Sequence, residues 1–251
     1  MRILLLGGTT EASDLAKKIS GAGLDAIFSY AGRTASPRSQ PLRTRIGGFG
    51  GVVGLKQFLS TERITHVIDA THPFAKGMSA NAFAACRTLA IPLIRYERAA
   101  WLPQPGDRWT HFARIEDCVS ALPEAPARVF LAIGKQQINP FARRHQHHYL
   151  LRFVDPPQTP PPLVHHRVVV AKGPFDVDQE VKLLRDQQID IIVAKNSGGQ
   201  GAAAKLTAAR MLRLPIFMVD RPEQRGEIVA HSGEDVMHWL HHNADLGVNT
   251  Y

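Results

Sequence analysis

The sequence is poor in cysteine, and this scarcity excludes several classes of protein. Only Cys86 and Cys118 occur in 251 residues, too few for a disulfide framework or a zinc knuckle. Both fall in segments predicted to be helical, where a single cysteine usually serves as a small core residue. The composition fits a reducing compartment, and we expect a cytoplasmic protein.

Long apolar runs are missing as well. The N-terminal run Ile3–Leu6 is followed at once by glycines, so we predict a strand there and not a signal peptide. No apolar stretch approaches the length of about 20 residues that a membrane helix needs. We therefore expect no membrane partner.

Acidic residues are outnumbered by basic ones, with 22 Asp and Glu against 30 Lys and Arg and a formal net charge of +8. This balance favours an anionic partner. The basic residues are scattered, however, with no run of five and no patch interleaved with aromatic residues. The sequence thus favours an anionic small molecule and argues against nucleic acid.

The histidines lack the spacing of a zinc site. They cluster at positions 145–148, 165–166 and 241–242, but none of these clusters matches a helix motif such as H-E-x-x-H. We interpret them as polar surface or strand-edge residues and predict no metal.

The sequence does contain alternating strand and helix patterns, and 44% of its residues are hydrophobic. This alternation predicts an α/β fold of two Rossmann-like domains with mainly parallel sheets and a cleft between the domains. A stretch rich in proline and glycine follows residue 96. We therefore place a dinucleotide-binding-like domain at residues 1–96 and a C-terminal α/β domain at residues 97–251.

A glycine turn follows the first predicted strand and opens a helix. Glycines let the backbone approach a phosphate, and the helix N-terminus attracts its charge. The full G-x-G-x-x-G pattern is absent, so a tight turn that binds no ligand is the alternative. The residues that we assign to cofactor binding in this turn are Gly7, Gly8, Thr9, Thr10 and Glu11.

The second predicted strand ends at Gly32, Arg33 and Thr34. NAD-binding units carry an acid at this place for the ribose hydroxyl. An arginine suits a 2′-phosphate instead, so we assign all three residues to cofactor binding and favour NADPH. The alternative is a solvated surface arginine.

A buried strand near residues 65–70 carries an acid, a hydroxyl and an imidazole at its end, namely Asp69, Thr71 and His72. In open α/β sheets, ligands bind outside the carboxyl ends of the strands. Pro73 suits the first turn of the next helix. We assign Thr71 and His72 to catalysis, and both with Pro73 to cofactor binding. The alternative is that Asp69 and Thr71 only cap the next helix.

A third loop of this kind follows the strand predicted for residues 190–194 and precedes a small-residue helix at 202–212. It again fits an anion at a helix N-terminus, so we assign Asn196, Ser197, Gly198 and Gly199 to cofactor binding. Five further basic residues are candidates for pairing with the carboxylates or phosphates of an anionic small molecule: Lys135, Lys172, Lys195, Lys205 and Arg221.

Taken together, these motifs resemble the precorrin-6A reductase family of cobalamin biosynthesis. The resemblance covers nearly the whole chain and rests on Gly7–Ala12, Gly32-Arg33, Asp69–Ala75, Lys195–Gly199 and Val219–Pro222. The chain departs from the family near residue 134, where Ala-Ile-Gly stands in place of the frequent Thr-Thr-Gly turn.

The resemblance implies a two-domain enzyme that uses NADPH to reduce one double bond of precorrin-6A, an anionic tetrapyrrole-derived macrocycle, to precorrin-6B. Thr71 and His72 would lie closest to the nicotinamide, where His72 shapes the pocket, donates a proton or caps a helix. We expect a monomer or weak oligomer. The alternatives are a cobalt-precorrin-6A reductase of the anaerobic route, an NADP-binding regulator without catalysis, and a nucleotide-sugar or SAM-dependent transferase.

Overall fold

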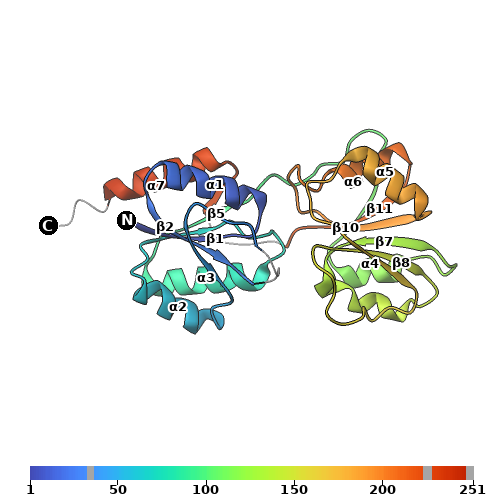
Figure 1. The fold of residues 1–251 in the computed structure, drawn as a ribbon, viewed down its shortest axis with the longest axis horizontal. Helices are drawn as coiled ribbons and strands as arrows, with labels where there is room; N and C mark the ends of the chain where they lie inside the picture. The colour runs from blue at the N-terminus through green and yellow to red at the C-terminus, as the bar shows by residue number, and fades with distance from the viewer. Residues whose placement is uncertain (33–36, 223–227, 247–251) are drawn as a thin grey trace. The chain divides into compact units, whose positions relative to one another are not determined.

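The computed structural model describes residues 1–32, 37–222 and 228–246, with side chains described as far as residue 242. The chain forms two compact units (Figure 1). The first unit comprises Met1–Ala99 and the described part of Glu223–Tyr251, and the second comprises Ala100–Pro222. Each unit is built around its own parallel sheet with helices on both faces.

The first unit holds a six-stranded sheet in the order β12-β5-β4-β1-β2-β3, in which every pairing is parallel. Its strands are β1 (Arg2–Leu6), β2 (Asp25–Tyr30), β3 (Arg43–Ile46), β4 (His66–Asp69), β5 (Leu93–Tyr96) and β12 (Ile228–Ala230). Side chains of β1 alternate between two cores, because parallel sheets are buried on both faces. Ile3 and Leu5 face one core, and Leu4 and Leu6 face the other.

The second unit repeats this plan in the order β6-β11-β10-β7-β8-β9, again with parallel pairings throughout. Its strands are β6 (Arg108–Phe112), β7 (Arg128–Ala132), β8 (His148–Phe153), β9 (His166–Val170), β10 (Ile191–Lys195) and β11 (Pro215–Val219). Two six-stranded parallel sheets confirm the predicted α/β class.

The two sheets exchange their sixth strands. Both follow the 3-2-1-4-5-6 order of doubly wound dinucleotide-binding sheets. However, β6 follows β5 in the chain and pairs with β11, whereas β12 follows β11 and pairs with β5. The C-terminal segment therefore belongs to the first unit, which differs from the predicted division at residues 97–251. Neither edge strand was predicted, because both are short and β6 is largely polar.

Helices cover both faces of each sheet (Figure 1). In the first unit, α1 and α7 pack together on one face, and α2 and α3 pack together on the other. In the second unit, α5 and α6 pack together on one face, while α4 lies on the opposite face. The bounds are α1 (Thr10–Gly21), α2 (Gly51–Thr61), α3 (Lys76–Leu89), α4 (Ile115–Ala121), α5 (Val177–Asp186), α6 (Ala204–Met211) and α7 (Gly233–Leu246), with short 3₁₀ helices at Lys135–Gln137 and Asn139–Arg143. Among the helices described, none is both long and apolar enough to cross a bilayer.

Candidate functional site

The topology of the first unit places a candidate site between the carboxyl ends of β1 and β4. The strand order reverses between these two neighbours, and such a switch point is where open α/β sheets bind ligands. Thr9 joins the two loops there. Its hydroxyl accepts from the Ala12 amide at 3.1 Å, which caps α1, and donates to the Ala70 carbonyl at 3.0 Å. The structure thus brings two predicted loops, 61 residues apart, into direct contact.

The two glycines after β1 have different roles. A Cβ on Gly7 would lie 2.1 Å from the Phe28 ring, so this position must stay bare for packing. Gly8 has a φ of +121°, and among the described residues beyond its chain neighbours no heavy atom lies within 4 Å of its Cβ position. The backbone at Gly8 is therefore open, as close approach of a phosphate requires.

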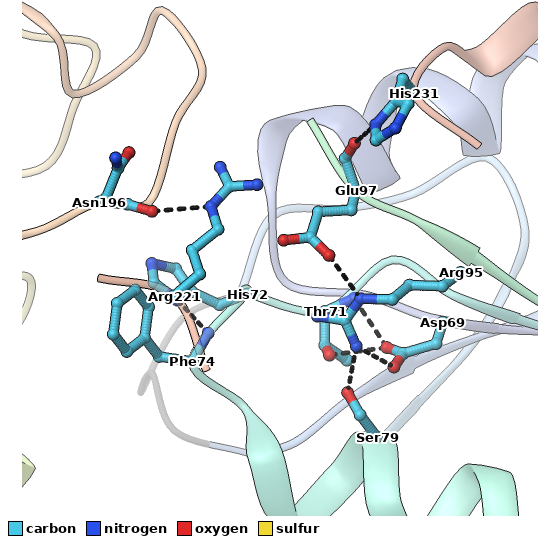
Figure 2. A network of polar contacts seen from close by, with 10 residues as sticks. All are labelled: Asp69, Thr71, His72, Phe74, Ser79, Arg95, Glu97, Asn196, Arg221 and His231. Carbon is cyan, nitrogen blue, oxygen red and sulfur yellow. Dashed lines mark hydrogen bonds and ion pairs between the residues drawn. The ribbon is translucent and has the colours of Figure 1, made fainter. Parts of the chain in front are cut away.

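A buried polar network of Asp69, Ser79, Arg95 and Glu97 lies next to Thr71 (Figure 2). Asp69 and Arg95 are each 2% exposed, and the Arg95 Nη1 lies 3.3 Å from the Asp69 Oδ2. The same nitrogen donates to the Ser79 hydroxyl at 2.9 Å, and the Arg95 Nε donates to Glu97 at 2.8 Å. Such charges are stable in a protein interior only when paired and hydrogen-bonded. The network fixes the position of Asp69, the last residue of β4.

Asp69 also sets the orientation of Thr71. Its Oδ1 accepts from both the amide of Thr71 at 3.1 Å and the hydroxyl of Thr71 at 2.6 Å. Because the hydroxyl proton points to Asp69, the remaining lone pairs of the Thr71 oxygen are left to accept from a ligand. The alternative role of these residues as helix caps is wrong: α3 begins at Lys76, after Ala75, without a side-chain cap.

His72 and Pro73 form a tight turn before α3. The Ala75 amide donates to the His72 carbonyl at 2.7 Å, so Pro73 occupies the turn and not the first helical turn as predicted. The Nδ1 of His72 accepts from the Phe74 amide at 3.2 Å. In the neutral ring, this contact places the proton on Nε2.

A small hollow opens beside these residues. It is lined by Thr9, Glu11, Thr71, Pro73, Tyr96, Glu97 and Arg98. Predicted residues of the β1 and β4 loops thus share one surface. Arg98 bridges to Glu11 with 2.6 Å between Nη1 and Oε2. Burial, reinforced by the negative charge of Glu11, raises the pKa of Tyr96, so this side chain stays a neutral phenol.

Sequence reasoning missed several residues of this site. Ser79 carries no signal of its own, because it acts through Arg95, 16 residues away. Tyr96 and Glu97 line the hollow and Glu97 pairs with Arg95, but no local pattern singles them out. Arg95 did carry a signal, since it is an arginine inside a strand that is otherwise mostly apolar. A buried cation of this kind implies a buried anion nearby.

The loop after β2 falls partly outside the described residues. Arg33 and Thr34 lie in the gap, so their predicted roles remain predictions. Gly32 is described and has a φ of +72°. Its Cβ position lies 3.4 Å from the Gly47 Cα, which places the end of β2 against the loop that follows β3.

In the second unit, the loop after β10 is held by Trp101. Asn196 accepts from the Trp101 amide at 2.8 Å and donates to the Trp101 carbonyl at 2.9 Å. The Trp101 indole donates to the Gly199 carbonyl at 2.8 Å, and Arg221 donates to the Asn196 carbonyl at 2.8 Å. Asn196 and Ser197 are buried, so their side chains support the loop, while Gly198 adopts a positive φ. The helix α6 begins only at Ala204, later than predicted.

The basic candidates of the second unit divide into two kinds. Lys135, Lys172, Lys195 and Arg221 all lie at or after the carboxyl ends of strands, on one edge of the sheet. Lys205 differs because it is only 7% exposed. Its Nζ donates to the Ala202 carbonyl at 2.6 Å and lies 4.6 Å from the Trp101 ring centroid. Within the described part of the chain, no three potential ligands converge as a metal site.

Comparisons with known proteins agree with this architecture. The family model of precorrin-6x reductase CbiJ/CobK matches residues 2–241. The precorrin-6A reductase of Rhodobacter capsulatus is 57% identical over 239 residues, with 95% of each chain covered. The precorrin-6A reductase of a Sinorhizobium species is 46% identical, covering 95% of this chain and 94% of its own.

More distant relatives and one solved structure complete the comparison. The cobalt-precorrin-6A reductase of Priestia megaterium is 28% identical, covering 95% of this chain and 97% of its own. A solved structure described as CobK precorrin-6A reductase superposes with a TM-score of 0.93 at 56% identity, with 96% of each chain covered.

Proposed function

The chain belongs to the precorrin-6x reductase family CbiJ/CobK, and from that premise we propose that it reduces precorrin-6A to precorrin-6B with NADPH. The observation that carries the proposal within this chain is the switch-point site, where the Gly7-Gly8 turn, the α1 N-terminus and Thr71 meet. That arrangement supports binding of a dinucleotide with its reactive end near Thr71.

The residues present fit a nicotinamide cofactor. The open backbone at Gly8 and the first amides of α1 suit the pyrophosphate. NADPH, when bound, supplies the hydride. Thr71 is oriented by Asp69, which accepts its hydroxyl proton, so the Thr71 oxygen can accept a hydrogen bond from the N–H of the nicotinamide carboxamide. A fixed side chain on a buried strand end is what orienting a hydride donor requires.

The reaction adds one hydride and one proton across a double bond, so the macrocycle gains two electrons and NADPH becomes NADP⁺. His72 lies in the turn before α3, where its Nδ1 accepts from the Phe74 amide. We assign His72 to shaping the pocket and water to supplying the proton. Tyr96 remains protonated beside the hollow and adds a hydrogen-bond donor there.

Substrate carboxylates would pair with the cations on the carboxyl edge of the second sheet, namely Lys135, Lys172, Lys195 and Arg221. Each contact of this kind is charge-assisted and gives strong orientation. Lys205 is not assigned to substrate binding, because its side chain is buried and its ammonium lies against the Trp101 ring.

The test is to incubate the protein with NADPH and precorrin-6A and follow both partners. We expect substrate-dependent loss of reduced nicotinamide and a product heavier by two hydrogen atoms. NADPH binding without oxidation would favour a regulator, and an absence of NADPH binding would refute the proposal.

A second substrate, cobalt-precorrin-6A, is the specific alternative. We infer that the cobalt-free macrocycle is preferred, because the relatives named for it share more of this sequence than those named for the cobalt form. Comparing kcat/KM for the two macrocycles tests this directly. A higher value for the cobalt-containing substrate would reverse the assignment.

A further inference from the structure

Arg45, on β3, donates to neutral groups alone among the residues that the structure describes. Its Nη1 donates to the Ser29 hydroxyl at 2.8 Å and to the Gly47 carbonyl at 2.9 Å, and its Nη2 donates to the Gly48 carbonyl at 3.1 Å. The guanidinium carbon lies 3.9 Å from the Phe49 ring centroid. These contacts fix the guanidinium in one orientation without neutralising its charge.

The charge of Arg45 lacks a counterion in the part of the chain that the structure describes. Arg43, two residues earlier on the same strand, forms a bidentate pair with Glu62 at 2.9 and 3.0 Å. Arg45 has no such carboxylate, and partial burial lowers its pKa. An arginine has five N–H donors, and among described residues acceptors are present for three of them. The Nε–H and one Nη2–H, which share one edge of the guanidinium, are left for a ligand.

The position of this cation is specific. Arg45 pairs in register with Ser29, one residue before the end of β2. The Gly47 amide donates to the Tyr30 carbonyl at 2.9 Å, and Gly32 lies against Gly47. The guanidinium is therefore at the carboxyl end of β2. In dinucleotide-binding sheets, this is where the 2′-substituent of the adenosine ribose is recognised.

We propose that Arg45 is a specificity residue that binds the 2′-phosphate of NADPH through its free guanidinium edge. This rests on the proposed function and names a recognition element for the same cofactor site. Guanidinium groups match phosphate oxygens in a bidentate geometry. Pre-orientation by Ser29, Gly47, Gly48 and the Phe49 ring reduces the entropy lost on binding. The role is independent of Arg33, which sequence reasoning assigned to the same phosphate.

The experiment measures dissociation constants of two ligand pairs that differ in the 2′-phosphate, NADPH against NADH and 2′,5′-ADP against 5′-AMP. Arg45→Gln is compared with wild type and with Arg43→Gln, which removes a strand arginine whose charge is already neutralised by Glu62. We expect Arg45→Gln to weaken NADPH and 2′,5′-ADP by about 10- to 100-fold. NADH and 5′-AMP should change little, and Arg43→Gln should leave both pairs unchanged.

Two results would overturn the inference. Equal weakening of both members of each pair would show that Arg45 only supports the Gly47–Gly48 backbone. Unchanged affinities would show that it does not touch the cofactor. If Arg45→Gln fails to fold, Arg45→Lys keeps the charge without the fork and should still lower the NADPH preference. Failure of the proposed function is distinct, because the wild-type protein would then bind no NADPH, or would bind it without oxidising it when precorrin-6A is added.

Discussion

Replacing Arg95 by leucine perturbs the network that holds Thr71, and the structure sets the expected magnitude. Arg95 and Asp69 are each 2% exposed. The substitution would leave the Asp69 carboxylate buried without its cation. Removing one partner of a buried pair costs about 3–5 kcal/mol. At roughly 3–4 °C per kcal/mol for a unit of this size, the melting temperature should fall by about 10–20 °C.

The Asp69→Asn/Arg95→Leu double variant separates the ion pair from the rest of the network. It removes both charges, so it should recover at least about 1 kcal/mol relative to the sum of the single variants. Unfolding by urea, followed by circular dichroism, measures each free energy of unfolding. Arg43→Leu is the matched control, because Arg43 is also a strand arginine of the first unit that pairs with a carboxylate, but its side chain is 62% exposed where that of Arg95 is 2% exposed.

The refuting result is a small effect. A loss below about 1 kcal/mol for Arg95→Leu, typical of a surface pair, would show that the network is not buried as described. Additive free energies in the double variant would show that Asp69 and Arg95 do not interact. Either outcome would remove the physical basis for a rigid Thr71.

Three further predictions concern the backbone, the imidazole and the thiols. Gly8→Ala places a Cβ at a φ of +121°, so it should lower the free energy of unfolding by about 1–3 kcal/mol. It should also weaken NADPH binding in a titration, and an unchanged affinity would remove Gly8 from the site. His72→Asn keeps an acceptor for the Phe74 amide, so single-turnover hydride transfer and NADPH affinity should both fall modestly, each by less than about 100-fold. A larger loss of hydride transfer with NADPH affinity intact would indicate general-acid catalysis instead. Burial raises the pKa of Cys86 and Cys118 to about 12, so alkylating reagents near neutral pH should modify these thiols only after unfolding; rapid labelling of the folded protein would contradict their burial.

Much of the fold was predictable because it is locally encoded. Apolar runs such as Ile3–Leu6, followed by glycine turns and helical periodicity, identify the inner strands and their crossovers. The exchange of β6 and β12 was not predictable in this way. A three-residue strand such as Ile228–Ala230 has no period to detect, and its partner β5 is specified only by tertiary packing.

The same distinction between local signals and tertiary contacts applies to the candidate site. Gly7, Gly8, Thr9 and Thr71 were predicted because strand ends with glycine or hydroxyl residues indicate ligand sites, and the structure places Thr9 and Thr71 at one hollow. Side chains that act across the sheet were missed. Arg95 reaches back 26 residues to Asp69, and such a contact depends on neighbouring strands that the sequence does not order.

The measurement that tests the central claim most directly is isotope transfer from the cofactor to the macrocycle. NADPH carrying deuterium at both C4 positions is mixed with the protein and precorrin-6A in ordinary water, and the product is analysed by mass spectrometry. The account predicts one deuterium and one solvent proton added per molecule. A reduced product without deuterium, or no reduction by a folded protein that binds NADPH, would contradict it.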